Sequence, residues 1–350
     1  MSDVFLSLRG LDKTFQGTPA PAVSDVSFSM PKGEILALLG PSGCGKTTTL
    51  RLIAGFETPD RGTIRIGGRI VQSGDIECPP EERRVGFVFQ DYALFPHLDV
   101  RRNVEFGLSG LALGDRRRRA RQAMDLCGLE GMELRFPHEL SGGQQQRTAL
   151  ARALAPGYEL LLLDEPLSNL DAALRTSLCK ELRRILKHAG RAAIVVTHDR
   201  EEAFQIADRV AVMRHGRLEQ VGSARDLHDR PVSRFVAEFV LDATFLAGVV
   251  ARRGVETEIG PIPGADSLAA GTNVVVAVRP QQLELTPSRD GSGVVVERVF
   301  RGSHERYRVR LPSGTELASF QTLRTEASSL DVGEPVALKL ADPAPPIFGE

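Results

Sequence analysis

The feature that most constrains the fold is a glycine-rich stretch between an apolar run and a helical pattern. Residues 40–47 read Gly-Pro-Ser-Gly-Cys-Gly-Lys-Thr and follow the apolar run 35–39. Consecutive backbone N–H groups can surround a phosphate only where side chains do not intrude, and a helix that begins near Lys46 would direct its positive end at that phosphate. The sequence therefore predicts a strand, a phosphate-binding loop and a helix, in that order.

Two side chains of this loop suit nucleotide chemistry. Lys46 can supply positive charge to the β and γ phosphates, and the Thr47 hydroxyl is an oxygen ligand for Mg²⁺. An ordinary glycine-rich turn is the competing interpretation, but a Lys-Thr pair between an apolar run and a helical pattern disfavours it. The loop alone predicts nucleotide binding and no more, because several classes of kinase and nucleotide hydrolase share it.

Two acidic residues follow a second apolar run. Residues 160–163 are four consecutive leucines, typical of a strand buried on both faces, and Asp164 and Glu165 come directly after them. Ligands of α/β sheets bind at the carboxyl ends of the strands. Asp164 would then hold Mg²⁺ through water, while Glu165 orients and deprotonates the attacking water. Two solvated acids at the end of a strand are an equally good interpretation of these residues alone.

A glycine pair begins another helical pattern. Ser141 can cap a helix whose apolar face includes Ala149 and Leu150, and Gly142 and Gly143 let backbone N–H groups approach a ligand. This would be a second anion-binding helix N-terminus in one domain. One domain has no evident need for two such sites, whereas two copies that face each other head to tail would each close on the nucleotide of the other.

The pattern of the chain changes near residue 240. Between residues 36 and 237, apolar runs alternate with helical periodicity, which predicts a mainly parallel α/β sheet. The segment of about 99–140 has helical patterning without a buried run, which predicts a helical insertion. After residue 241, short β-rich runs separated by Gly and Pro predict a small all-β barrel or sandwich. These runs are residues 245–250, 273–278, 293–300, 306–311 and 335–340.

Composition argues against several classes of function. The 350 residues carry a formal net charge of −1, so no long-range field would gather nucleic acid. No apolar run reaches the roughly 18 residues that a membrane span needs, so any membrane role would come through other chains. The first residues lack the basic and apolar pattern of a leader, so we expect no secretory signal. The four cysteines are scattered, which favours reduced thiols over a disulfide framework or a metal site.

In these segments and in their order, the chain resembles the ATP-binding cassette (ABC) ATPase family. The resemblance implies further site residues. Gln90, at the end of an apolar run, would be a ligand of Mg²⁺ and water, and His198, at the end of another, would contact the γ-phosphate. Residues 168–171 resemble the D-loop, which passes between the two sites. Phe15 stands where the family often has a tyrosine that stacks on adenine; a phenyl ring also stacks, although ordinary core packing is the alternative.

The resemblance implies ATP and Mg²⁺ as cofactors and a defined set of site residues. Catalysis is assigned to Glu165, His198 and Gln90. The Mg²⁺ ion is assigned to Thr47, Gln90 and Asp164, the last through water. The residues expected to bind ATP are Phe15, Gly40, Pro41, Ser42, Gly43, Cys44, Gly45, Lys46, Thr47, Thr48, Ser141, Gly142, Gly143, Gln144 and Asp171.

The implied fold is an α/β P-loop ABC ATPase domain with a helical insertion, followed by a small all-β domain of the oligonucleotide-binding (OB) or TOBE type. We place the ATPase domain at residues 1–240 and the regulatory TOBE-like domain at residues 241–350. The second domain lacks the aromatic platform and basic groove of nucleic-acid binders. We therefore expect it to enlarge a dimer interface or to sense a regulator, and we expect no nucleic-acid partner.

The resemblance further implies the ATP-hydrolysing motor of an importer, a translocase. Residues 15–16, 55–57 and 137–139 look most like iron(III)-uptake ATPases, so Fe³⁺ is the expected cargo. Polyamine, sulfate and sugar importers are the alternatives, and a non-transport ABC ATPase of DNA repair or translation is less favoured. The expected partners are a second copy, transmembrane permease subunits and an extracytoplasmic substrate-binding protein. The motor would lie peripherally on the cytoplasmic face of the inner (plasma) membrane.

Overall fold

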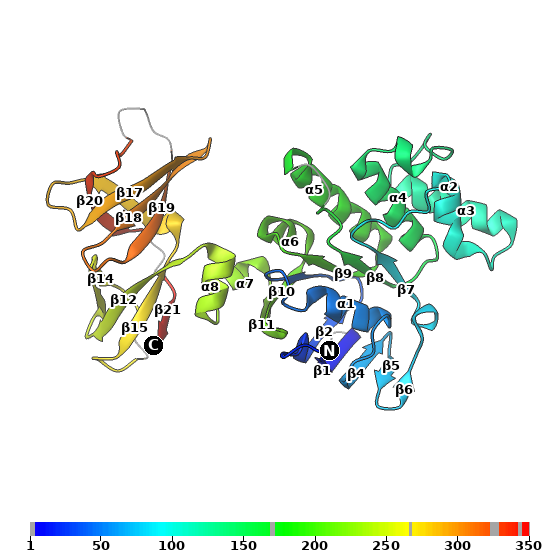
Figure 1. Cartoon of the computed structure of the whole chain (residues 1–350), viewed down its shortest axis with the longest axis horizontal. Helices are drawn as coiled ribbons and strands as arrows, with labels where there is room; N and C mark the ends of the chain where they lie inside the picture. Colours follow the sequence, from blue (N-terminus) through cyan, green and yellow to red (C-terminus); the bar gives the residue numbers. More distant parts are fainter. Residues whose placement is uncertain (1–3, 169–171, 266–267, 323–328, 342–344, 350) are drawn as a thin grey trace. The chain divides into compact units, whose positions relative to one another are not determined.

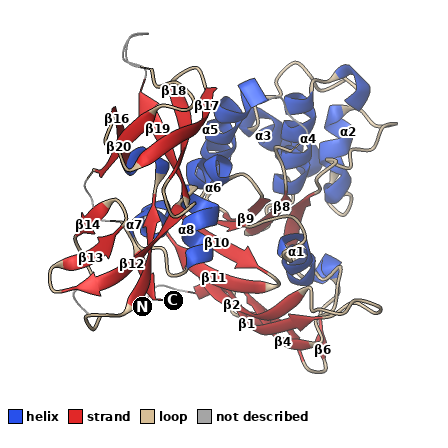
Figure 2. Ribbon diagram, turned by 60° about the vertical axis from the view of Figure 1, so that its left-hand side comes forward, coloured by secondary structure: helices blue, strands red, loops and turns tan. Residues whose placement is uncertain are grey.

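The computed structural model describes residues 4–168, 172–265, 268–322, 329–341 and 345–349. The chain divides into two compact units, residues 1–224 and residues 225–350. The first unit combines sheets with helices, and the second is built mainly of strands (Figures 1 and 2). The domain boundary near residue 240 stays a prediction.

A six-stranded sheet forms the centre of the first unit, in the order β11-β10-β3-β9-β8-β7. Its neighbouring strands are parallel from β10 to β7, and β11 pairs antiparallel with β10. This arrangement confirms the predicted mainly parallel α/β sheet. The strands are β3 (Ile35–Leu39), β7 (Val85–Val88), β8 (Leu160–Asp164), β9 (Ala192–Thr197), β10 (Arg209–Arg214) and β11 (Arg217–Gly222).

The leucine run of β8 is buried on both faces, as its sequence predicts. Leu161 and Leu163 belong to the core shared with the helical segment, whereas Leu160 and Leu162 belong to the core shared with the first helix and the antiparallel strands. Successive side chains of a strand point to opposite faces, so a strand between two cores needs an unbroken apolar run.

Antiparallel strands and the helices α1 to α6 complete the described part of the first unit. A five-stranded sheet has the order β2-β1-β4-β5-β6. Residues 99–140 contain helices and no strand, which confirms the predicted insertion. The strands are β1 (Val4–Lys13), β2 (Val23–Pro31), β4 (Arg61–Ile66), β5 (Arg69–Ser73) and β6 (Ile76–Glu77). The helices are α1 (Lys46–Ala54), α2 (Val100–Glu105), α3 (Leu113–Leu126), α4 (Gly142–Leu154), α5 (Ala172–Ala189) and α6 (Arg200–Ile206).

A buried arginine holds the C-terminus of α1. Arg83 is 3% exposed, and its Nη1 donates to the carbonyl oxygens of Leu52, at 2.7 Å, and Ile53, at 3.1 Å. Its Nε donates to the Cys78 carbonyl and its Nη2 to Gln72 Oε1. A positive charge at the C-terminus of a helix stabilises it, because the last carbonyl groups carry negative partial charge. Burial lowers the pKa of Arg83 from its ordinary value.

The second unit contains two five-stranded antiparallel sheets, in the orders β14-β13-β12-β15-β21 and β16-β20-β17-β18-β19. Both sheets contribute to one core, with Leu246 and Val276 from the first and Val295 and Tyr307 from the second. This confirms the predicted all-β region. The strands are β12 (Thr244–Ala251), β13 (Gly254–Thr257), β14 (Gly260–Ile262), β15 (Asn273–Val278), β16 (Leu283–Pro287), β17 (Gly293–Phe300), β18 (His304–Arg310), β19 (Glu316–Thr322), β20 (Pro335–Leu340) and β21 (Ile347–Gly349).

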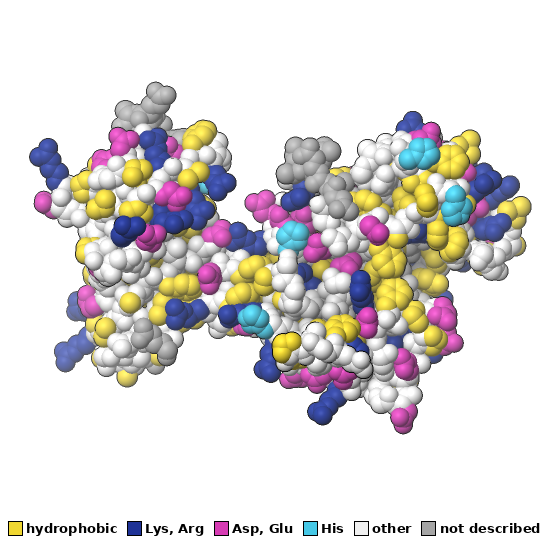
Figure 3. Space-filling view, viewed as in Figure 1, with side chains coloured by type: hydrophobic (Ala, Val, Ile, Leu, Met, Phe, Trp, Pro, Cys, Tyr) yellow, Lys and Arg dark blue, Asp and Glu magenta, His cyan; other side chains and the backbone are white. Residues whose placement is uncertain are grey.

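Two short helices precede these strands, α7 (Ala224–Asp229) and α8 (Arg234–Leu241), and α8 packs on β15. On the face shown in Figure 3, the cationic and anionic side chains of each unit are interspersed. Within the described ranges, none of the helices has both the length and the apolar character that a membrane crossing requires.

Candidate active site

The phosphate loop (residues 40–47) joins β3 to α1, and two of its glycines, Gly40 and Gly45, lie where a side chain would not fit. Gly45 has a φ angle of 104°, which side chains rarely permit. A Cβ atom on Gly45 would lie 2.2 Å from the carbonyl oxygen of Ala22. One on Gly40 would lie 2.4 Å from the carbonyl oxygen of Met213. The loop therefore needs glycine at these two positions because the neighbouring backbone approaches so closely.

The Lys46 side chain is held inside this loop. It is 5% exposed, and its Nζ donates to the carbonyl oxygens of Gly40, at 2.8 Å, and Pro41, at 3.0 Å. Cys44 Sγ lies 3.8 Å from the same Nζ, and burial raises the pKa of its thiol, which makes it a neutral packing group. Among the other predicted ATP contacts, Pro41, Ser42 and Gly43 are exposed, and Thr48 is half-buried.

A hydrogen bond joins the phosphate loop to the end of β8. Thr47 Oγ1 donates to Asp164 Oδ1 over 2.8 Å. Burial raises the pKa of Asp164, the hydrogen bond from Thr47 lowers it, and the neighbouring Glu165 raises it. A hydroxyl and a carboxylate so close together are the oxygen donors that Mg²⁺ prefers, and the ion's charge would offset the burial of Asp164. The two residues therefore fit a Mg²⁺ ion that is shared with a phosphate.

The three predicted catalytic residues come together at the carboxylate of Glu165. Gln90 Nε2 donates to Glu165 Oε2 at 3.4 Å, and His198 Nδ1 lies 3.4 Å from Glu165 Oε1. These residues are far apart in the sequence but follow β7, β8 and β9, which are neighbours in the sheet. The carboxyl ends of parallel strands meet at one edge, so the topology brings the side chains together.

The backbone of Glu165 is strained and well anchored. Its φ angle is +43°, a conformation that non-glycine residues rarely adopt and that recurs at functional sites. Its N–H donates to the carbonyl oxygen of Val196 at 3.1 Å, and its own carbonyl accepts from Ser168 Oγ at 2.9 Å. These bonds hold the carboxylate at the edge of the sheet, where its side chain stays 19% exposed.

The helix that begins at Ser141 has its own closed hydrogen-bond pattern. Ser141 Oγ accepts from the backbone N–H of Gln144 at 3.4 Å, and Gln144 Oε1 accepts from the backbone N–H of Ser141 at 2.9 Å. This capping box confirms Ser141 as the helix cap and uses the Gln144 side chain for structure. Within the described residues, no hydrogen bond or ion pair joins residues 141–144 to residues 40–47 of the same copy.

The other two predicted ATP contacts have different outcomes. Phe15 is half-buried, belongs to neither hydrophobic core of the first unit, and has Lys13 Nζ 5.4 Å from its ring centre. Its ring is thus available for stacking and is not an ordinary core residue. Asp171, with Asn169 and Leu170 of the expected D-loop, lies outside the described residues.

Two residues that the sequence analysis missed fix the segment after Gln90. Asn103 is fully buried, and its Nδ2 donates to the carbonyl oxygens of Phe95 and Leu98 at 3.1 and 2.9 Å. Arg152 donates to the carbonyl oxygens of Tyr92 and Ala93 at 2.8 and 2.7 Å. The sequence carried a signal for both residues: each is a polar residue beside a core position of a helix, Asn103 in α2 and Arg152 in α4.

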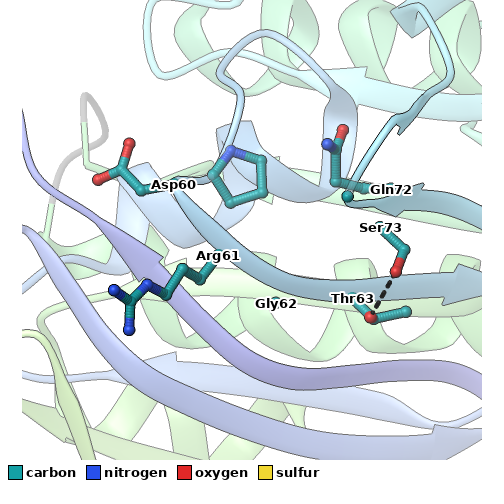
Figure 4. Close-up of a pocket in the computed structure, with 8 residues that line it drawn as sticks. Asp60, Arg61, Gly62, Thr63, Gln72 and Ser73 are labelled. Atoms are coloured by element: carbon teal, nitrogen blue, oxygen red, sulfur yellow. Dashed lines mark hydrogen bonds between the residues drawn. The ribbon is translucent and has the colours of Figure 1, made fainter.

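The close-up in Figure 4 shows a pocket of about 390 Å³ between β4 and β5, bridged by the Thr63–Ser73 hydroxyl pair at 3.0 Å. None of the predicted site residues lines it. Its labelled charges, Asp60 and Arg61, lie at the start of β4. This pocket is therefore separate from the candidate active site.

Two family models match the chain. Residues 23–168 match the ABC transporter model, and residues 276–344 match the TOBE domain model. The first match ends just beyond Glu165 and includes the phosphate loop, Gln90 and Ser141. The second lies within the β-rich unit.

Known relatives match over most of the chain. A spermidine/putrescine import ATP-binding protein, PotA, of Rubrobacter xylanophilus is 44% identical, with 91% of this chain and 87% of the relative covered. An Fe(3+) ions import ATP-binding protein, FbpC 1, of Rhodococcus jostii is 43% identical, with 96% of each chain covered.

A solved structure supports the same relationship for the first unit. The dimer of the ATP-binding cassette MJ0796 in a post-hydrolysis state, bound to ADP and Pi, matches with a TM-score of 0.56 and 31% identity. It covers 63% of this chain and 98% of that protein. By its motifs, its sheet order, its converging side chains and these matches, the chain belongs to the ABC transporter family, as an ATPase with a C-terminal TOBE domain.

Proposed function

We propose that this chain is the ATP-hydrolysing motor of an importer, and that it works as a homodimer with two composite ATP sites. The convergence of Gln90 and His198 on the Glu165 carboxylate, beside the Thr47–Asp164 pair, carries the proposal. A nucleotide sensor without turnover would not need a carboxylate held in reach of two polar side chains. The relatives named above as import ATP-binding proteins support the importer role.

Each side chain has a distinct task in the proposed reaction. Lys46 and the N–H groups of the phosphate loop bind and orient the β and γ phosphates. Glu165 holds the attacking water and takes its proton, and Gln90 and His198 keep that carboxylate in place, with His198 also facing the γ-phosphate. A bound Mg²⁺ ion, held by Thr47 and by Asp164 through water, would neutralise charge that develops on the phosphates.

The second half of each site would come from the other copy. Ser141 and the glycines after it form a capped helix N-terminus that, within the described residues, has no hydrogen bond to the phosphate loop of its own copy. Helix N-termini bind anions, so this end suits a phosphate delivered by a second molecule. The solved MJ0796 structures are dimers, which supports the same assembly for this chain.

An exposed aromatic surface beside Gln90 is a candidate docking site for the permease. Phe56, Phe87 and Phe89 contact one another with ring centres 4.5 to 5.9 Å apart, and Phe56 and Phe89 are 46% and 37% exposed. Figure 3 shows hydrophobic side chains gathered over the region of β7. Aromatic side chains are common at the centres of protein interfaces. This surface would place the motor peripherally at the cytoplasmic face of the membrane.

For the cargo, two cations are the leading candidates. The expectation from the sequence is Fe³⁺, and the FbpC relative supports it. The PotA relatives, named for spermidine and putrescine, are as similar to this chain. The relatives therefore do not single out Fe³⁺, and we propose uptake of Fe³⁺ with polyamine as the second candidate.

Reconstituted transport tests both parts of this proposal. The motor would be placed in liposomes with the permease and the binding protein encoded beside it. ATP hydrolysis would then be measured with the binding protein loaded with Fe³⁺, spermidine or sulfate. Stimulation by Fe³⁺ supports the iron assignment, and stimulation by spermidine alone replaces it with polyamine uptake. Absence of hydrolysis under every condition contradicts the motor itself.

A further inference from the structure

The turn that carries His198 is closed by a small ring of hydrogen bonds. Thr197 Oγ1 donates to Glu202 Oε2 at 2.6 Å. The backbone N–H of Glu202 donates to Asp199 Oδ1 at 3.0 Å, and the backbone N–H of Asp199 donates to Thr197 Oγ1, also at 3.0 Å. The two neighbours of His198 in the chain are thus both bonded to Glu202, Thr197 to its carboxylate and Asp199 to its backbone N–H.

Glu202 is buried and needs a compensating charge. It is 5% exposed, and its burial raises its pKa, while the Thr197 hydrogen bond lowers it, Asp199 raises it, and Arg175 and His198 lower it. A buried carboxylate is strongly destabilising when it lacks a partner. The turn can hold an ionised Glu202 only if a cation lies close to it.

Arg175 of helix α5 is that cation. Its Nε lies 3.3 Å from Glu202 Oε1, and its Nη1 donates to Asp199 Oδ2 at 3.5 Å. The Nε atom is buried and makes no hydrogen bond, so its contact with Glu202 is an ion pair. The side chain of Arg175 is 30% exposed, whereas that of Glu202 is 6% exposed. An ordinary surface ion pair has two exposed partners and contributes little, which is not the situation here.

We propose that Arg175 is a positioning residue for His198: it neutralises the buried Glu202 and so holds the His198 turn in the orientation that hydrolysis requires. This inference rests on the proposed ATPase function. Arg175 itself touches neither Glu165 nor the phosphate loop in the described contacts, so its effect on turnover passes through the turn. Helix α5 and the His198 turn are thereby joined by one guanidinium group.

The test compares variants of the full chain in steady-state ATP hydrolysis and in nucleotide binding. Arg175→Met keeps a long apolar side chain and removes the charge. We expect kcat to fall about tenfold or more, because a displaced catalytic group costs up to about 10² in rate. The KM for ATP should change little, because the phosphate loop is untouched. Arg184→Met, an exposed residue on the same helix, is the matched control and should keep wild-type kcat.

A double-mutant cycle separates positioning from a general loss of structure. His198→Ala should cost about 10² in the wild-type background but only about tenfold in the Arg175→Met background, so that the double variant is about as slow as His198→Ala alone, since His198 is already displaced there. If the two losses multiply in full, Arg175 does not act through His198. A wild-type kcat in Arg175→Met overturns the inference and leaves the ATPase function intact. No hydrolysis by the wild-type chain contradicts the function itself.

Rescue provides the second measurement. Glu202→Gln keeps an oxygen that accepts from Thr197 and removes the buried charge, so Arg175→Met with Glu202→Gln should regain most of the lost kcat. Arg175→Lys keeps a positive charge and should lie between wild type and Arg175→Met. If Arg175→Met fails to fold, these two variants carry the same comparison. A double variant as slow as Arg175→Met, or an Arg175→Lys variant no better than it, excludes charge compensation as the role of Arg175.

Discussion

The two glycine-rich helix starts of the first unit differ in what they are connected to. At the start of α1, Lys46 is buried in the loop, and Thr47 reaches the carboxylate at the end of β8. At the start of α4, Ser141 and Gln144 satisfy each other, and the capping serine stays exposed. Both ends can bind an anion, but among the described residues only the first is hydrogen-bonded to the candidate catalytic edge of its own copy, through Asp164.

This difference fits the homodimer that we propose above. A loop that is hydrogen-bonded to Asp164 can bind a nucleotide beside Glu165, whereas a self-contained cap can only close over one. The cap is therefore useful where another molecule supplies the nucleotide. Substitutions at the two helix starts and at the end of β8 should then separate nucleotide binding, closure of the dimer and hydrolysis. The following four predictions test that separation.

The largest expected effect is at Glu165. Glu165→Gln keeps the size of the side chain and one accepting oxygen but cannot take a proton, so kcat should fall by about 10²–10⁴. ATP should still bind, and the closed dimer should accumulate in size-exclusion chromatography. Glu201→Gln on helix α6 is the control. An unchanged kcat would remove Glu165 from the mechanism.

The next effect concerns the cap. Ser141→Arg should leave ATP binding by the monomer intact, because the phosphate loop is unaltered, and should reduce turnover by about 10² or more, because a bulky cation blocks closure over the nucleotide. Ser109→Arg, on the exposed part of the helical insertion, is the control. Normal turnover of Ser141→Arg, at a concentration where the wild type is active, would rule out the head-to-tail pair.

A smaller effect concerns stability, through the buried Asp164 at the end of β8. Burial raises the pKa of Asp164 above its ordinary 3.8, so the folded state takes up a proton more readily than the unfolded state. Burial of the ionised carboxylate therefore lowers the free energy of unfolding at neutral pH. This loss disappears as the pH falls through the folded-state pKa of Asp164. Asp164→Asn should therefore raise the free energy of unfolding by about 1 kcal/mol at pH 7.

The gain in the free energy of unfolding that Asp164→Asn brings should shrink toward pH 4. The same variant should lose Mg²⁺-dependent turnover. Chemical denaturation at several pH values measures the gain, with the exposed Asp75→Asn as the control. A lower stability than wild type at pH 7 would mean that the Thr47 hydrogen bond outweighs the cost of burial.

The smallest effect concerns the capping box. Gln144→Ala removes the acceptor of the Ser141 N–H and should lower the free energy of unfolding by about 0.5–1 kcal/mol. Turnover should stay within about threefold of wild type, because the backbone N–H groups of α4 remain. Gln122→Ala on the exposed face of α3 is the control. A collapse of turnover without loss of stability would make Gln144 a ligand contact.

The convergence of the catalytic residues was predictable because it depends on strand order. Gln90, Glu165 and His198 each follow an apolar run, and parallel strands place such positions at one edge. The five β-rich runs after residue 241 likewise became strands, since their local patterns are strong. Chemistry that follows from local pattern and topology can thus be predicted from the chain.

Contacts decided by tertiary neighbours could not be predicted. The φ of Glu165 depends on the bond that its N–H donates to Val196 and on the bond that its carbonyl accepts from Ser168. The roles of Asn103 and Arg152 depend on how the helical insertion packs. Short strands such as β13, β14 and β21 were also missed, because three or four residues carry little periodicity and their pairing is set by the neighbouring strands. The Arg175–Glu202 pair belongs to this group.

The buried guanidinium at the far end of α1 has a mechanical consequence. One end of this helix presents the phosphate loop, and the other is bonded through Arg83 to the Gln72 side chain of β5 and the Cys78 carbonyl. Both ends of α1 are thus fixed, and we expect a displacement of the phosphate loop to reach the antiparallel sheet through these bonds. Because Arg83 makes these bonds with a planar, multidentate group, a lysine in its place would weaken the attachment of α1 while preserving the charge.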